Sequence, residues 1–245
     1  MKQSYKISAI IVVTRATLIL FFSKPVMTQN PEYHQFIDQR NMWGIPNAMD
    51  VLTNICFLIV GALGLSEAFK KNELTKKSWI VFFIGILLVA PGSAYYHWAP
   101  DNFTLVWDRL PMSIGFMALY IAVLSEHVNL KCEKYLPAAL IIGIASVLVW
   151  VLTTDLRMYF WIQFSSFVTI PMTLLLFPSR YTHRSWIWYS LLAYGFAKWA
   201  EAKDEAVFQA TNQLISGHSL KHILAAVGLG CLWWMVRVRH DRTNL

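Results

Sequence analysis

Residues 217–236 have the sequence GHSLKHILAAVGLGCLWWMV, a run that is long and apolar enough to cross a membrane. A transmembrane α-helix needs about 20 mainly apolar residues, because the hydrocarbon core of a bilayer is about 30 Å thick. This stretch therefore predicts one membrane-spanning helix, and the same pattern recurs along the rest of the chain.

Six further apolar segments precede it and are separated by short polar connections: residues 47–67, 78–98, 108–127, 135–153, 158–177 and 185–199. The chain of 245 residues is 56% hydrophobic and only 14% charged, whereas a soluble domain carries about 25% charged residues. The sequence predicts an all-α, polytopic membrane protein whose residues 47–238 form a seven-transmembrane-helix bundle. The three cysteines lack the spacing of a metal site or a disulfide framework.

The N-terminal region carries an additional hydrophobic segment. Residues 1–23 begin with two lysines followed by an apolar run, which is typical of a signal peptide or of an N-terminal anchor. Residues 24–46 are polar and aromatic, and we expect a non-cytoplasmic loop or an interfacial helix there. Residues 239–245 form the predicted cytoplasmic tail.

Basic residues gather on alternate connections, which orients the bundle. The connections after the first, third and fifth segments and the C-terminal tail hold Lys70, Lys71, Lys76, Lys77, Lys131, Lys134, Arg180, Arg184, Arg237, Arg239 and Arg242. This distribution predicts a cytoplasmic C-terminus. It also accounts for the net charge of +7 without a nucleic-acid partner, and no stretch indicates an obligate protein partner.

Three histidines predict a metal site. His218 and His222 are four residues apart, so they share one face of a helix and both imidazoles can reach a single ion. His97 falls at the same, non-cytoplasmic end of its segment and is the candidate third ligand. Three histidines with an open fourth position are a catalytic Zn²⁺ arrangement. The alternative is that these histidines pack in the bundle and pair with serine or aspartate side chains.

Two further residues at this depth are candidates for catalysis. Asp108 begins the third segment and is placed to accept a proton from water and to pass it to a leaving amine. Ser93 shares the helical face of His97 and is placed to hydrogen-bond a developing oxyanion. The active site is therefore expected towards the non-cytoplasmic face.

Two weaker groups of polar residues lie nearby. Asp204 and Glu205 follow the sixth segment and either support the metal ligands or are simply solvated. An oxygen-rich cation site is the second candidate, formed by Asp38, Asn41, Asn47 and Asp50. We favour helix capping by Asn47 or Asp50 as the explanation of this second group.

These motifs resemble the alkaline ceramidase family. The resemblance rests on Gly92-Ser93-x-x-x-His97, on Trp107-Asp108-Arg109-Leu110-Pro111-Met112 and on His218-x-x-x-His222, and it spans residues 47–236. That family belongs to a superfamily of seven-helix membrane hydrolases that includes adiponectin-receptor-like proteins and GPI-remodelling lipid hydrolases. The resemblance implies Zn²⁺ held by the three histidines and catalysis by Asp108 and Ser93. The implied reaction cleaves the N-acyl bond of a ceramide-like membrane lipid to a sphingoid base and a fatty acid.

The sequence departs from the family pattern in two places. The usual Asp-Glu-Leu-Pro-Met has Arg109 in place of the glutamate. The eukaryotic enzymes also carry an acidic N-terminal calcium motif, and the corresponding stretch here offers only Asp38, Asn41 and Asn47, which argues against Ca²⁺.

Three other functions use some of the same features. A zinc-containing receptor of the adiponectin-receptor type predicts a closed site with a fourth protein ligand. A lipid esterase would use the same residues on an ester bond. A transporter with the histidines as proton relay predicts inverted repeats and broken helices at the middle of the membrane.

Overall fold

The computed structural model describes residues 2–71 and 73–244. The structure is 78% helix, and the described residues contain no strand apart from isolated bridges. The principal helices are α1 (Gln3–Phe22), α3 (Ile55–Lys70), α4 (Lys76–Trp98), α5 (Asn102–His127), α6 (Leu136–Thr153), α7 (Arg157–Leu176), α8 (Ser185–Ala202) and α10 (Gly217–Val238). The shorter helices are α2 (Ala48–Leu52), α9 (Asp204–Ala210) and three 3-10 turns, η1 (Pro31–His34), η2 (Leu130–Tyr135) and η3 (Arg242–Asn244). The all-α prediction is confirmed.

Seven of the described helices are long and apolar enough to cross a membrane: α1, α2 with α3, α4, α5, η2 with α6, α7 and α10. The chain is therefore an integral, multi-pass membrane protein. Helix α8 coincides with the predicted sixth segment but is not among these seven. Its tryptophans and tyrosines, together with Lys198 and Glu201, make it less apolar than the others.

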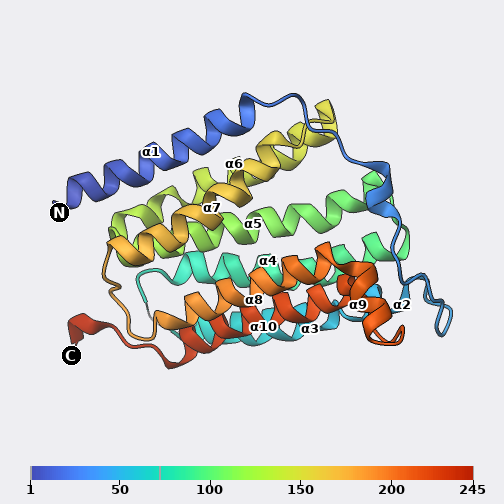
Figure 1. Ribbon diagram of the computed structural model, residues 1–245. Helices are drawn as coiled ribbons and strands as arrows, with labels where there is room; N and C mark the ends of the chain where they lie inside the picture. The colour runs from blue at the N-terminus through green and yellow to red at the C-terminus, as the bar shows by residue number, and fades with distance from the viewer. Residues whose placement is uncertain (1, 72, 245) are drawn as a thin grey trace.

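The long helices run side by side along one axis (Figure 1). Helices α4 and α5 pack against each other in the middle of the bundle, with α3, α8 and α10 on one side and α1, α6 and α7 on the other. Both chain termini lie at one end of the bundle, which we call the terminal end. Helices α2 and α9 lie at the opposite end, which we call the α9 end, and the segment 24–46 runs across it.

Helix α1 lies along α7. The Lys6 Nζ donates a hydrogen bond to the Leu176 carbonyl oxygen at 2.6 Å, near the terminal end. Towards the other end of α1, the Trp161 Nε1 donates to the Thr17 hydroxyl at 3.3 Å. Helix α1 is thus docked along the bundle, and a signal peptide or N-terminal anchor over residues 1–23 stays a prediction.

Buried charges hold the terminal end together. The Arg239 guanidinium, 1% exposed, donates from Nη1 to the Glu126 carboxylate at 2.8 Å and also pairs with Glu73. The same Glu126 oxygen accepts hydrogen bonds from the Trp79 Nε1 at 2.6 Å and the Thr75 hydroxyl at 3.0 Å. These bonds join the end of α10 to α4, α5 and the connection between α3 and α4.

We predict that Arg239→Ala lowers the free energy of unfolding by about 3–5 kcal/mol, because it leaves the Glu126 carboxylate buried without its counter-ion. The measurement is thermal or chemical unfolding of the detergent-purified protein. Arg180→Ala is the matched control, since Arg180 and Asp241 form a more exposed ion pair with side chains 27% and 18% accessible. Loss of that pair should cost about 0–1 kcal/mol. Equal losses of unfolding free energy in the two variants would contradict the role of the buried Arg239–Glu126 pair in holding the terminal end together.

Candidate metal centre

Helices α4 and α10 bring His97, His218 and His222 together at the α9 end. His97 lies in the last turn of α4, and the other two lie in the first two turns of α10. One ring nitrogen from each histidine lies within 4.8 Å of the others, and all three side chains are buried. Within the described part of the chain, these three histidines form the group of potential metal-binding side chains that lie close enough together to hold one ion. The structure thus brings these three residues together.

Two nitrogens of the triad are spaced as a zinc ion requires. The Nε2 atoms of His97 and His218 lie 3.4 Å apart. Two imidazole nitrogens bound to one tetrahedral zinc at 2.0–2.1 Å would be about 3.3 Å apart. Neutral imidazole nitrogens are also a donor type that zinc prefers.

Thr53 sets the orientation of one candidate ligand. Its hydroxyl donates to the Met49 carbonyl oxygen at 2.7 Å and lies 2.9 Å from the His222 Nδ1. Because the hydroxyl proton is used on Met49, the His222 Nδ1 carries the proton of their shared hydrogen bond. The Nε2 of His222 is then the nitrogen with a free lone pair, as a metal ligand requires.

The start of α10 is built to place His218. The Ser216 hydroxyl caps the helix by accepting a hydrogen bond from the Ser219 backbone N–H at 3.0 Å. Asp204 accepts a hydrogen bond from the His218 backbone N–H at 2.8 Å. A side chain at Gly217 would overlap the Ala200 carbonyl oxygen, so only glycine allows α10 to start so close to α8. Asp204 therefore holds the backbone of His218, one of the candidate metal ligands.

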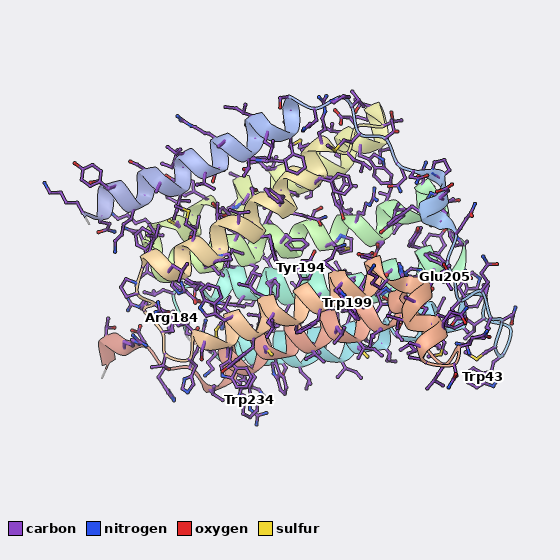
Figure 2. All side chains as sticks on the ribbon, in the orientation of Figure 1. Trp43, Arg184, Tyr194, Trp199, Glu205 and Trp234 are labelled. Carbon is purple, nitrogen blue, oxygen red and sulfur yellow. The ribbon has the colours of Figure 1, made fainter. Side chains whose placement is uncertain are left out.

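Glu205 lies on the outside of α9, as Figure 2 shows. Its side chain is exposed to the surroundings, in agreement with the solvated alternative for this residue.

The capping explanation for Asn47 and Asp50 is wrong. Asn47 stands at the N-cap position of α2 without a capping hydrogen bond, because its side chain instead donates to the His97 carbonyl oxygen at 2.8 Å. Asp50 is inside α2 and fully buried, and it accepts a hydrogen bond from the Ser219 hydroxyl at 2.5 Å. Both side chains therefore tie α2 to the helices that carry the triad.

The other two members of the oxygen-rich group lie in the segment 24–46. The Asp38 carboxylate is engaged by the Arg40 guanidinium, at 2.5 Å from its Nη2. Asn41 precedes the short bridge between Met42 and Ile45. The two carboxylates of the predicted cation site thus have separate partners, Arg40 for Asp38 and Ser219 for Asp50.

The segment 24–46 covers the triad from the α9 end. The buried Phe36 ring lies 4.7 Å from the His97 ring and 5.0 Å from the His218 ring, measured between centroids. The His34 ring is held by the Tyr96 hydroxyl and the Asn102 side chain, each at 3.1 Å. Phe36 was not among the predicted site residues, because nothing local in its sequence links it to the histidines.

A cavity of about 310 Å³ opens beside the triad. Ser93, Asp108 and His222 line it at the α9 end. A side chain at Gly92 would overlap the Trp107 carbonyl oxygen, so this glycine allows the close approach of α4 and α5 that brings Ser93 to Asp108. The structure thus groups both predicted catalytic residues with one histidine of the triad.

Towards the terminal end the cavity is apolar. Its walls there come from α4, α5, α7, α8 and α10 and include Phe82, Ile86, Met112, Phe116, Leu119, Ile170, Leu191, Leu229 and Leu232. Tyr194 of α8 also lines it and lies near the middle of the bundle (Figure 2). A volume of this size is typical of small-molecule sites, and its shape suits a polar group beside the histidines and an apolar chain behind it.

An ion pair borders the triad on the α8 side. The Lys221 Nζ lies 2.9 Å from the Glu201 carboxylate and 2.9 Å from the His218 Nε2. Lys198 also pairs with Glu201, and all three side chains line the cavity. Lys221 could have been recognised as a site residue from the sequence, because a charged residue inside an apolar span is costly and is usually functional.

Known proteins were compared with the whole chain. No curated protein and no solved structure shows significant similarity to it. A family model described as Ceramidase matches residues 44–244, which include all of the triad, Ser93 and Asp108. This match covers most of the chain and nearly all of the bundle that forms the site. The chain therefore belongs to the ceramidase family.

Proposed function

We propose that the protein is an intramembrane, zinc-dependent amide hydrolase that cleaves the N-acyl bond of a ceramide-like lipid. Membership of the ceramidase family supports ceramide hydrolysis in general. The observation that carries the finer proposal is the buried triad beside a cavity with a polar end and an apolar end. A zinc ion bound to His97, His218 and His222 would acidify water and polarise a carbonyl group.

The residues of this chain supply the proton transfers. The Asp108 carboxylate accepts a proton from the attacking water and delivers it to the leaving nitrogen, as general acid–base catalysis of amide hydrolysis requires. The Ser93 hydroxyl lies at the same end of the cavity as Asp108 and is placed to donate a hydrogen bond to the oxyanion that develops on the substrate carbonyl. Phe36 limits access of bulk water from the α9 end.

The substrate reaches this site from the membrane. Its acyl chain lies in the apolar part of the cavity, between α7 on one side and α8 on the other. The distribution of basic residues favours a cytoplasmic terminal end and a non-cytoplasmic α9 end. A lipid of the outer leaflet would therefore enter laterally, with its amide at the level of the histidines.

The cavity favours an enzyme over a receptor with a structural zinc site. A structural site is closed by a fourth protein ligand, whereas His222 of the triad borders open space. An ester lipid would fit the same cavity, so an esterase is the alternative within the same chemistry.

We predict that wild-type protein purified in detergent binds about one zinc per chain and releases fatty acid from ceramides. His218→Ala should lose both, because removal of one of three protein ligands leaves too few for a stable site. Metal content and acyl release are measured on the same preparations. His183→Ala, in an exposed connection, is the control and should keep both. Full hydrolysis by metal-free protein would refute the mechanism, and release from ester lipids alone would favour the esterase.

We also predict that Asp108→Asn keeps its zinc but lowers kcat by about 10²–10⁴-fold, because the amide side chain cannot accept the proton. Zinc content and initial rates with a saturating ceramide separate the two effects. Glu205→Gln removes an exposed carboxylate at the same end and should behave as wild type. An Asp108→Asn protein with zinc and full activity would exclude Asp108 as the base.

A further inference from the structure

One cationic side chain that lines the cavity forms no ion pair within the described part of the chain. Arg109 follows Asp108 on α5, lines the same cavity and is only 4% exposed. Its Nη2 donates a hydrogen bond to the Gln29 side-chain oxygen at 2.6 Å. Its Nη1 is buried and has no hydrogen-bond partner. Within the described residues, Arg109 makes no ion pair.

Aromatic rings hold this guanidinium in place. Its central carbon lies 4.4 Å from the ring centre of Trp150, 4.9 Å from that of Tyr159 and 5.7 Å from that of Tyr33. Cation–π contacts of this kind stabilise an arginine and fix its plane. They do not replace a hydrogen-bond acceptor for Nη1, so one edge of a well-oriented guanidinium remains to be satisfied.

The charges that line the cavity do not balance. The cations are Lys198, Lys221 and Arg109, and the acids are Glu201 and Asp108. Glu201 is shared by the two lysines, and Asp108 lies beside Ser93. A buried cation without a partner is expensive, and within a membrane protein such a charge usually serves a ligand. An anionic group on a ligand in the cavity would provide Arg109 with a counter-ion.

We propose that Arg109 binds an anionic headgroup, so that the preferred substrate is an acidic N-acyl lipid with a carboxylate, sulfonate or phosphate near its amide. This inference rests on the proposed amide hydrolysis and specifies its substrate class. Asp108 and Arg109 both line the cavity. In ceramide-like lipids the headgroup oxygen is two carbons from the amide nitrogen, so one molecule can reach both residues.

The test compares lipids that share an acyl chain and differ in headgroup charge. One pair is N-palmitoylglycine with N-palmitoylethanolamine, and the other is N-palmitoylsphingosine 1-phosphate with N-palmitoylsphingosine. For wild type, we expect kcat/KM to favour the anionic member of at least one pair by about 10- to 100-fold, the value of a hydrogen bond to a charged group. The two pairs distinguish a carboxylate site from a phosphate site.

Arg109→Gln should bring the ratio of kcat/KM for the anionic lipid to kcat/KM for its uncharged partner towards one, mainly through a higher KM for the anionic lipid. Arg109→Lys keeps the charge but not the planar edge, and should retain part of the preference. Arg157→Gln is the matched control, because Arg157 pairs with Asp155 at the same end but does not line the cavity. It should keep the wild-type ratio. A purely structural role for Arg109 would lower stability and leave the ratio unchanged.

A wild-type ratio near one in both pairs, or an Arg109→Gln protein that keeps the preference, would overturn the proposal. Failure of every lipid to release its acyl chain would instead reject the proposed hydrolysis. In that case binding still tests the site. The anionic member of at least one pair should raise the melting temperature of wild type more than its uncharged partner does, and Arg109→Gln should abolish that difference. Equal stabilisation of wild type by the two members of both pairs would overturn the Arg109 assignment.

Discussion

Polar side chains inside this bundle must find their partners within the protein, because the apolar helices around them offer little water. The site at the α9 end follows from this constraint. Thr53 orients His222, Asp204 holds the backbone of His218, and Asp50 joins α2 to α10 through Ser219. Each bond satisfies a buried group and also fixes the position of a candidate ligand or of the helix that carries it.

The two ends of the bundle use buried charge differently. At the terminal end, Arg239 is surrounded by carboxylates and aromatic rings, so its charge is matched and the helices are held together. At the α9 end, the charges around the cavity remain unequal, and Arg109 is held by aromatic rings without a carboxylate. A matched cluster supports a rigid frame, whereas unmatched groups that face a cavity are available to a ligand.

The segment 24–46 lies mostly outside the family match but is part of the site. Phe36 covers two histidines, and Gln29 positions the guanidinium of Arg109. The histidine triad and the residues that cover it are therefore supplied by different parts of this chain.

The helical segments and the histidine triad could be predicted from the sequence, because both depend on local spacing. Apolar runs of membrane-spanning length predict helices, and an i,i+4 pair must share a helical face. The basic connections then placed His97 and Asp108 at the same end as that pair. Helix α8 was harder to classify, since its aromatic residues are only weakly apolar, although its position beside α10 agrees with the predicted bundle.

The partners of these residues were decided by the tertiary structure. Asn47 was expected to cap a helix, but packing of α2 against α4 turns its side chain to the His97 carbonyl. Phe36, Thr53 and Glu201 meet the histidines or their neighbours only because distant segments pack together. A side chain's local pattern determines which face it occupies. Which groups it meets there depends on how whole helices pack, and that is not encoded in any short stretch of sequence.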